Sequence, residues 1–212
     1  MESSVYIFDG MDYMKVLNFQ RHLNELRNND KIGDSFIILE HDDVYTSGVH
    51  YKGNTKGIIK TERGGYLTYH GPGQLVTYFI VNLKERKMNA MDIIIKIQNT
   101  IMELLEKYGI EAHAEFNEKT GVWVGNKKIC SIGLAIKGFS TLHGMALNVN
   151  TDLNKFLKIN PCNFNPDIMT SMENILGNRL NYGKIKGEYL KILLKDFNIE
   201  KYSIIKSIEN NY

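Results

Sequence analysis

The sequence contains two cysteines, and one of them, Cys162, lies in a segment suited to exposed chemistry. It occurs in the stretch NPCNFNP, between Pro161 and Pro166. Proline fixes the backbone angle φ and lacks an N–H donor, so the chain around this thiol is stiff. A cysteine in a rigid loop after a short helix could act as a nucleophile. A buried cysteine that only fills space is the more common case, and the residues alone leave both interpretations open.

Lys128 is the residue that could activate such a thiol. It is the second residue of the stretch KKICSIGL. A lysine at the edge of a glycine-bearing strand can point into a cleft. A nearby ammonium favours the thiolate, which is the nucleophilic form of cysteine. The same amine could carry a proton between reacting groups. The alternative for Lys128 is an ordinary solvated lysine. Cys130, in the same apolar stretch, is expected to pack inside a sheet.

Glycine is concentrated in the stretch GGYLTYHGPGQ, where four glycines stand among aromatic and β-branched residues. These are Gly64, Gly65, Gly71 and Gly73. Without Cβ atoms, their backbone could line a narrow slot. Its walls would then come from Tyr66, Leu67 and Tyr69. The alternative is a bulged hairpin whose glycines serve only its own turns.

Two of the six histidines precede a glycine, His70 in YHGPG and His143 in LHG. Each could be a structural histidine with satisfied hydrogen bonds. Because the same pair recurs in two glycine-containing strand segments, the two histidines could instead form opposite walls of one cleft. No histidine shows ligand spacing such as HxxxH and no cysteine pair is close together, so the sequence indicates neither a metal site nor a cofactor.

The elements that must position these residues are strands in the middle of the chain, with helices before, within and after them. Strands are predicted over residues 4–10, 35–40, 75–83 and 143–150, with two more in 121–136 joined by a turn at Gly125–Asn126. Helices are predicted over 11–29, 90–110, 151–159 and 187–197. This arrangement favours an α+β fold with a mixed or antiparallel sheet. The last dozen residues could be a tail or a short strand.

Two details of the helices can be tested. Thr151 is expected to cap the short helix that precedes Cys162. The helix over 90–110 is expected to end at Gly109 in the C′ position. Its apolar face is predicted to consist of Met91, Ile94, Ile95, Ile101, Leu104, Leu105 and Tyr108.

Composition indicates an ordinary globular protein. The 212 residues carry a net charge of +2, which gives no electrostatic case for nucleic acid or a membrane surface. No apolar run approaches the roughly 20 residues that a membrane span needs. The N-terminus lacks the basic region of a signal peptide. With two cysteines there is no disulfide framework, so we expect a reducing, cytoplasmic setting.

Three long stretches resemble one family. Residues 63–84, 121–136 and 142–162 are similar, in order and spacing, to the lipoyl(octanoyl) transferases of lipoate biosynthesis. The resemblance implies one catalytic domain over residues 1–212, with a central mixed sheet flanked by helices as in the biotin and lipoate protein ligases. It implies transfer of an octanoyl group from acyl carrier protein to a lysine of a lipoyl domain. Such acceptors belong to 2-oxoacid dehydrogenases and to the glycine cleavage H protein. A monomer without cofactor is expected.

The resemblance also assigns roles to residues. It makes Cys162 the nucleophile that carries the acyl group as a thioester, and Lys128 its partner. The implied acyl-binding residues are Arg63, Gly64, Gly65, Tyr66, Leu67, Thr68, Tyr69, His70, Ser131, Ile132, Gly133, His143, Gly144, Met145 and Ala146.

This chain departs from the family pattern at two positions. Asn163 replaces the usual glycine after the cysteine, and Ala135 stands where an arginine often follows the SIGL strand. Three other functions therefore remain to be compared. They are a lipoate ligase that needs ATP, a non-catalytic relative that binds lipoyl domains, and a thiol hydrolase that releases free octanoate.

Overall fold

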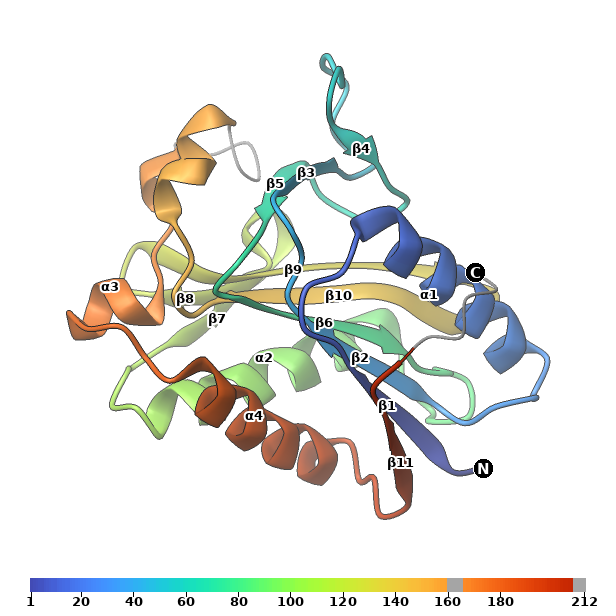
Figure 1. Cartoon of the computed structure of the whole chain (residues 1–212). Helices are drawn as coiled ribbons and strands as arrows, with labels where there is room; N and C mark the ends of the chain where they lie inside the picture. The colour runs from blue at the N-terminus through green and yellow to red at the C-terminus, as the bar shows by residue number, and fades with distance from the viewer. Residues whose placement is uncertain (160–165, 208–212) are drawn as a thin grey trace.

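A single mixed sheet forms the centre of the computed structural model, which describes residues 1–159 and 166–207 (Figure 1). Its eight strands follow the order β11–β1–β2–β6–β10–β9–β8–β7. β1 runs parallel to both of its neighbours, β2 and β11, while the remaining pairs are antiparallel. The predicted α+β fold with a mixed central sheet is confirmed.

The strands of this sheet are β1 (Ser3–Ile7), β2 (Ser35–Leu39), β6 (Gln74–Ile80), β7 (His113–Glu115), β8 (Gly121–Val124), β9 (Lys127–Lys137), β10 (Ser140–Asn148) and β11 (Tyr202–Ile205). A second, three-stranded sheet contains β3 (Val44–Ser47), β4 (Ile59–Lys60) and β5 (Leu67–His70). The helices are α1 (Tyr13–Asn28), α2 (Ala90–Glu106), α3 (Met172–Leu176) and α4 (Tyr182–Asp196), with short 3-10 turns η1 (Asn117–Lys119), η2 (Leu153–Lys158) and η3 (Pro166–Ile168).

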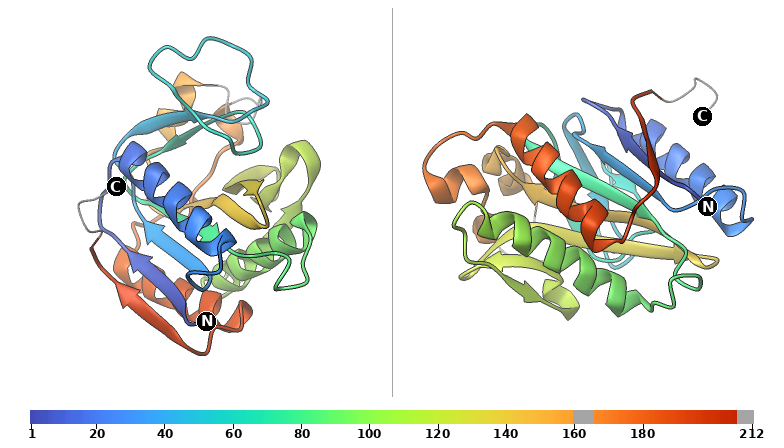
Figure 2. Two further views of the ribbon diagram at one scale, coloured as in Figure 1. Left: turned by 90° about the vertical axis from the view of Figure 1, so that its right-hand side faces the viewer. Right: turned by 90° about the horizontal axis from the view of Figure 1, so that it is seen from below.

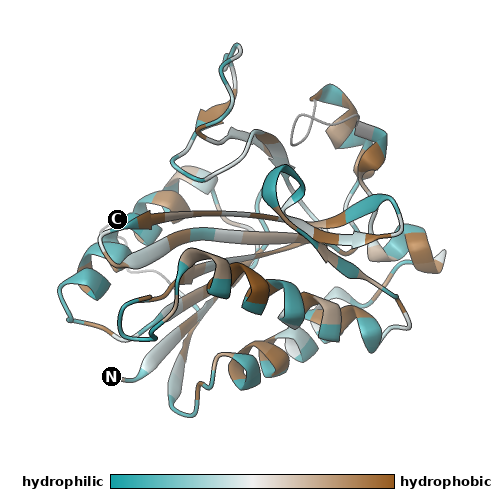
Figure 3. Ribbon diagram, turned by 180° about the vertical axis from the view of Figure 1, so that it is seen from behind, coloured by the Kyte–Doolittle hydropathy of each residue, from teal (hydrophilic) through white to brown (hydrophobic). Residues whose placement is uncertain are grey.

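Helices cover both faces of the large sheet (Figure 2). α1 begins at Asp12, whose carboxylate accepts a hydrogen bond from the Lys15 amide at 2.8 Å. It packs Val16 and Leu17 against β2 and β6. α2 and α4 cover the opposite face, where the larger core cluster lies. In Figure 3 the helices show hydrophobic stripes alternating with hydrophilic ones, as expected of elements with one buried side.

The buried stripe of α2 differs from the predicted one. Met91 and Ile95 are 45% and 39% exposed, whereas the unpredicted Ile93 and Ile97 are buried, in line with the correctly predicted Ile101. The helix has apolar residues on several sides, so periodicity alone does not select the stripe that meets the sheet and α4. The helix terminus is as expected, because Gly109 follows it with a positive φ of 70°.

The short helix before Cys162 is a 3-10 turn, and its cap is Asp152 rather than Thr151. The Asp152 carboxylate accepts a hydrogen bond from the Asn154 amide at 3.0 Å. Thr151 is buried instead, and its hydroxyl donates to the Gly73 carbonyl at 3.2 Å. The prediction of Thr151 as the cap is therefore wrong by one residue, because a tertiary contact occupies its hydroxyl.

The bulged-hairpin alternative for the glycine-rich stretch that begins at Gly64 is also wrong. β5 pairs with β3 in the small sheet, whereas β6 pairs with β2 and β10 in the large one. Residues 71–73 therefore lead from one sheet to the other. The predicted hairpin of β8 and β9 is confirmed, with Gly125 at φ 55° in its turn.

The C-terminal segment contributes a short strand. β11 pairs in parallel with β1, so part of the last dozen residues forms the edge of the large sheet. Among residues 1–159 and 166–207, no helix combines the length and the apolar character needed to cross a membrane.

Candidate active site

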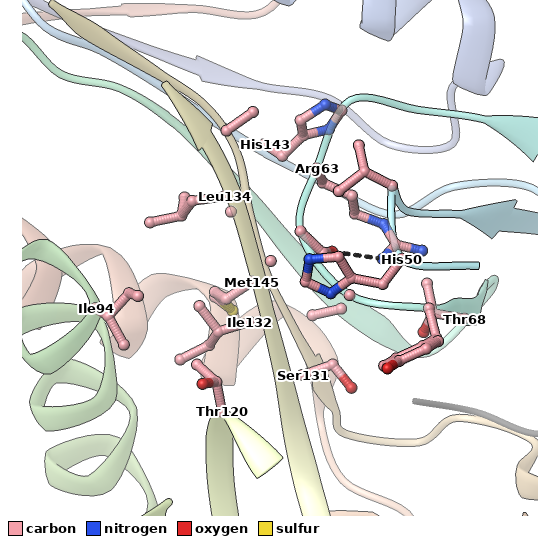
Figure 4. Close-up of a pocket in the computed structure, with 18 of the residues that line it drawn as sticks. His50, Arg63, Thr68, Ile94, Thr120, Ser131, Ile132, Leu134, His143 and Met145 are labelled. Carbon is pink, nitrogen blue, oxygen red and sulfur yellow. Dashed lines mark hydrogen bonds between the residues drawn. The ribbon is translucent and has the colours of Figure 1, made fainter. Parts of the chain in front are cut away.

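A cavity of about 870 Å³ lies where the two sheets meet (Figure 4). β9 and β10 supply one wall, and β5 with the preceding residues 63–66 supplies another. Of the predicted acyl-binding residues, thirteen line this cavity: Arg63, Gly64, Gly65, Tyr66, Thr68, His70, Ser131, Ile132, Gly133, His143, Gly144, Met145 and Ala146. Segments far apart in sequence are thus brought together at one site, and both His–Gly pairs contribute to it.

Leu67 and Tyr69 do not line this cavity, which corrects the prediction that they form its walls. Successive side chains of a strand point to opposite faces, so Thr68 and His70 face the cavity and their neighbours face away. Tyr69 donates a hydrogen bond to Asp43 at 2.6 Å and packs edge-on against Phe156, with ring centroids 5.4 Å apart. Its role is to hold η2 in place.

The glycines of the GGYLTYHGPGQ stretch also divide into two kinds. Gly64 and Gly65 line the cavity as predicted, and the Gly64 amide donates to the Leu134 carbonyl of β9 at 2.9 Å. Gly71 and Gly73 do not line it. A Cβ on Gly73 would lie 2.4 Å from the Asn150 carbonyl oxygen, so this glycine permits a close backbone approach to the residues after β10. The expectation that Gly71 and Gly73 line a slot is wrong.

Lys128 is almost completely buried, with 1% of its surface exposed, and it lines the cavity. Its Nζ lies 5.5 Å from the centroid of the Trp123 ring. A Cβ on Gly121 would come within 2.7 Å of Lys128 Cε, so glycine at this position makes room for the lysine stem. An ammonium beside an aromatic face gains cation–π stabilisation, which offsets part of its desolvation.

The chain that follows Cys162 in sequence returns to Lys128. Met169 forms a β-bridge with Lys128, and the Thr170 amide donates to the Lys128 carbonyl at 2.9 Å. Cys162 itself, the predicted nucleophile, lies outside the described residues, as does Asn163. The predicted meeting of Lys128 and Cys162 therefore stays a prediction.

Cys130 behaves as the sequence predicts, as a packing residue. It is fully buried in β9 within the larger core cluster. Burial raises the pKa of its thiol to about 12, and the positive charge of Lys128 offsets only part of this effect. At neutral pH the thiolate of Cys130 is therefore scarce.

Two buried histidines, His70 and His143, line the cavity, and a third, His41, lies behind them with its ring centroid 5.9 Å from that of His70. Burial lowers the pKa of His70 to about 3, and its Nδ1 donates to Gln74 at 2.8 Å. Its ring stacks on that of Tyr13, with 5.9 Å between the two ring centroids. Burial lowers the pKa of His41 to about 4, and the Tyr78 hydroxyl donates to its Nε2 at 2.7 Å. The His70 side chain therefore contributes no positive charge to the cavity wall at neutral pH.

His143 has an unusual backbone. Its φ of 61° lies in the left-handed region, where its amide turns out of the sheet and donates to Gln20 at 3.0 Å. Its ring faces Glu62, with 3.5 Å between Nε2 and Oε2. Burial lowers the pKa of His143. The pKa of Glu62 is also lowered, by the adjacent His143 ring and by Arg21, whose guanidinium donates to both carboxylate oxygens at 3.0 Å.

Arg63 holds the wall opposite β9. Its guanidinium donates to the Gly64 carbonyl at 3.0 Å and to both the carbonyl and hydroxyl of Thr46, at 3.1 and 3.0 Å. These bonds fix the loop before β5 against β3. The prediction placed Arg63 at the cavity, and the structure adds this anchoring role.

Several cavity residues escaped the sequence analysis. Tyr13 enters from the start of α1, Tyr78 from β6 and Ile94 from α2. None belongs to a motif, and only the packing of helices on the sheet brings them to the site. The alternation of side chains along β6 could have predicted that Tyr78 faces α1. It could not have predicted that this face adjoins a cavity. Within the described ranges, no three His, Cys, Asp or Glu side chains are grouped as a metal site.

A family model for the lipoyl protein ligase A/B catalytic domain matches residues 12–193. The chain belongs to this family. A relative named "Probable octanoyltransferase 2" from Picrophilus torridus is 61% identical over 199 residues, which cover 94% of this chain and 81% of the relative. An octanoyltransferase from Caldicellulosiruptor bescii is 36% identical over 212 residues, covering 88% of this chain and 92% of that protein. Within the family, the chain thus belongs with the octanoyltransferases.

Solved structures agree on the fold. A lipoate-protein ligase A bound with ATP superimposes with a TM-score of 0.75 at 15% identity, covering 99% of this chain and 90% of the other. The apo biotin protein ligase of Aquifex aeolicus gives a TM-score of 0.56 at 15% identity, covering 93% and 70%. The predicted likeness to the biotin and lipoate ligase fold is confirmed.

Ala135 also lines the cavity. It stands where the resemblance stated above leads us to expect an arginine. Its methyl group leaves that wall small and uncharged. The fixed positive charges among the described cavity-lining residues are therefore those of Lys52, Arg63 and Lys128.

Proposed function

We propose that this octanoyltransferase moves an octanoyl group from acyl carrier protein to a lysine of a lipoyl domain, through a thioester on Cys162. One observation carries the proposal beyond family membership. A buried lysine, Lys128, lies at a mainly apolar cavity and pairs with the segment that follows Cys162 in sequence. This arrangement suits an amine that activates a thiol next to a lipid chain.

The reaction then has two balanced steps. The Cys162 thiolate attacks the carbonyl carbon of the donor thioester, the carbon–sulfur bond to the donor breaks, and the donor leaves as a thiol after gaining a proton. The neutral acceptor amine next attacks the acyl-cysteine, loses one proton, and releases Cys162 as the thiolate with which the cycle began. Lys128 supplies the first proton and accepts the second. Exchange between two thioesters is nearly even in free energy, so the intermediate is accessible.

The proposed substrate-binding residues are those that line the cavity. The backbone of Gly64 and Gly65, together with Ile132 and Met145, would contact the acyl chain. The neutral ring of His70 suits the same apolar environment, since a charged imidazolium would be costly there. Specificity per methylene is expected to be modest, about 1–3 kcal/mol.

We extend the proposal to the setting of the enzyme. Residues 1–212 would act as one catalytic domain and as a monomer in the cytoplasm. The acceptors would be lipoyl domains of 2-oxoacid dehydrogenases and the glycine cleavage H protein. Support comes from the resemblance of three long stretches and from the low net charge of +2.

The acyl intermediate is tested by intact mass. Incubation with octanoyl carrier protein should add one octanoyl group to the wild-type protein and to Cys130→Ala, but not to Cys162→Ser. The reason is that the buried Cys130 thiol has its pKa raised to about 12, so it is a poor nucleophile. An adduct that survives Cys162→Ser but disappears in Cys130→Ala would contradict the assignment.

The charge pair is tested separately. Two unit charges ~4 Å apart at an effective dielectric of ~20 interact by about 4 kcal/mol, so Lys128 could lower the Cys162 pKa by up to roughly three units. Lys128→Ala should therefore shift the pH profile of Cys162 alkylation by iodoacetamide toward higher pH. A profile that does not move would remove the charge-pair account while leaving the adduct unaffected.

Dependence on ATP separates transfer from ligation. Octanoyl transfer from the carrier protein should proceed at the same rate with ATP and without it. Incorporation of free octanoate that requires ATP, with none from the carrier thioester, would indicate a ligase. Release of free octanoate without product on the acceptor would indicate a hydrolase.

A further inference from the structure

A second groove, of about 350 Å³, lies on the other side of β5 from the cavity. It is lined by Tyr51, Ile58, Tyr66, Leu67, Leu157, Lys158 and Ile159. One wall is the loop between β3 and β4, and the other is the end of η2. Figure 1 shows this loop and η2 rising on the same side of the large sheet.

The groove adjoins the proposed reaction centre. Tyr66 lines both the groove and the cavity, so the two spaces share a rim. Ile159, at the other end, precedes Cys162 by three residues in the sequence. A substrate that lies in the cavity and extends past Tyr66 would therefore meet this groove.

The wall formed by η2 is held firmly. The Tyr45 hydroxyl donates to the Lys155 carbonyl at 3.0 Å, and Lys155 forms an ion pair with Asp43. Phe156 is fully buried against Tyr69. Because Phe156 points inward, Leu157 and Lys158 next to it project outward, and Leu157 is 56% exposed. This positioning is built into the fold and is independent of the acyl cavity.

The chemistry of the groove is mixed. Ile58, Leu67 and Leu157 provide apolar surface, and the two tyrosines provide hydroxyl groups. Lys158 is exposed at the rim. Within the part of the chain that the structure describes, Lys158 forms no ion pair, in contrast to the neighbouring Lys155. Lys158 acts on the Asp43 carboxylate only as a weaker influence than Lys155, which pairs with it directly. An exposed amine beside an apolar groove suits a ligand with an anionic end and an apolar body.

The charge of the groove comes from Lys158. Among the described residues that line the groove, it is the charged one, and the others are apolar or carry a phenol hydroxyl. Lys155, on the same wall, is paired with Asp43. An anionic ligand group in the groove would therefore be attracted chiefly by Lys158.

We propose that this groove binds the phosphopantetheine arm of the thioester donor, with Lys158 beside its phosphate. The inference rests on the proposed function and names the donor chemistry at the same site. The gem-dimethyl and amide groups of the arm match apolar walls with hydroxyl groups, and its phosphate matches the exposed amine of Lys158. Carrier protein and coenzyme A both present this arm, so the groove recognises their shared part.

The test compares two small donors that differ only in the phosphate, octanoyl-phosphopantetheine and octanoyl-pantetheine. The readout is kcat/KM for octanoyl transfer to an isolated lipoyl domain. We expect the wild-type protein to prefer the phosphorylated donor, and Lys158→Ala to reduce that preference about tenfold. Lys191→Ala, which removes an exposed lysine from α4, should keep the wild-type preference.

A second variant acts on the body of the groove. Leu157→Glu places a negative charge next to the proposed phosphate position on a residue that is already exposed, so the fold should tolerate it. It should lower kcat/KM for the phosphorylated donor more than for octanoyl-pantetheine. Octanoyl carrier protein and octanoyl coenzyme A are assayed in parallel. The one whose kcat/KM exceeds that of octanoyl-phosphopantetheine is identified as the donor that presents the arm.

The outcomes separate the two proposals. Equal losses with both small donors, or an effect only on the KM for the lipoyl domain, would overturn the phosphopantetheine site while leaving octanoyl transfer intact. If the wild-type protein forms no octanoyl adduct with any of the thioesters, the proposed function fails, and the phosphopantetheine site fails with it.

Discussion

His70 and His41 show how burial sets the charge of individual side chains next to the cavity. Both rings are kept neutral at physiological pH because taking an imidazolium out of water is costly. His70 also lies near the positive charge of Arg63, which acts in the same direction. An octanoyl chain in the cavity would thus meet neutral rings, which an apolar ligand requires.

The same burial predicts acid sensitivity. With pKa values of about 3 and about 4 in the folded state, His70 and His41 bind no proton between pH 6.5 and pH 5, whereas the unfolded chain does. The stability that comes from keeping these two histidines neutral is therefore fully present above about pH 6.5 and is lost as the pH falls. Each histidine should lower the free energy of unfolding by up to about 1.4 kcal/mol per pH unit. Urea denaturation at several pH values measures this slope.

A matched variant identifies the source of the slope. His70→Gln retains a polar side chain that can bond to Gln74, but it cannot take up a proton. Its free energy of unfolding should depend on pH with a slope smaller by about 1 kcal/mol per pH unit. If the variant and the wild-type protein have the same slope, His70 is not buried in its neutral form.

At the residue scale, the sequence located the cavity well but not the side chains within each strand. Thirteen of fifteen predicted acyl-binding residues line it. The two exceptions, Leu67 and Tyr69, lie on the far face of β5 because of strand alternation. A glycine-rich stretch does not reveal where a strand begins, and so it does not reveal which residues face inward. Tyr13 could not be found, since only tertiary packing brings α1 to the site.

Among the secondary-structure elements, β10 depends on glycine for its position in the sheet. Gly144 pairs with Tyr78 of β6 and Gly133 of β9. A Cβ on Gly144 would lie 1.9 Å from the Thr77 carbonyl oxygen and 2.8 Å from Phe79 Cδ2. Neither the backbone carbonyl nor the buried ring can move freely in the middle of the sheet.

Gly144→Ala is therefore expected to destabilise the protein. Forcing β6 and β10 apart should lower the free energy of unfolding by about 1–3 kcal/mol or more, measured by urea denaturation. Gly187→Ala is the control, because this exposed glycine in α4 has nothing within 4 Å of the added Cβ. It should stabilise the protein by about 0.5–1 kcal/mol through helix propensity. Equal effects of the two changes would contradict the packing argument.

Most elements could be predicted from the sequence, but their partners could not. The helices and central strands follow from periodicity, as for α1 and β2. The pairing of β5 with β3 rather than β6 could not be read from a stretch in which glycine and proline occur on both sides of a strand. Likewise, the sequence left open whether the last dozen residues form a tail or a short strand, because the place of β11 beside β1 depends on where α4 ends.

For the molecule as a whole, one carboxylate connects both helical layers to the large sheet. Asp34, buried just before β2, accepts hydrogen bonds from Arg27 of α1 at 2.9 Å and from Arg86 at 2.5 Å. The Asn82 amide donates to it as well, at 3.0 Å. Arg86 also donates to the Phe197 carbonyl at the end of α4, at 2.6 Å. Helices on opposite faces of the sheet are therefore joined at this edge.

Replacing Asp34 by asparagine tests how much this connection contributes. Asp34→Asn removes the negative charge that Arg27 and Arg86 share, while Arg27 keeps its ion pairs with Glu85 and Asp30. The free energy of unfolding should therefore fall by about 1–3 kcal/mol. The control is Lys184→Gln, which breaks the exposed pair of Lys184 and Glu188 within α4 and should cost less than about 1 kcal/mol. Urea denaturation followed by circular dichroism measures both. A loss below 1 kcal/mol for Asp34→Asn would mean that the two layers are held to the sheet by apolar packing alone.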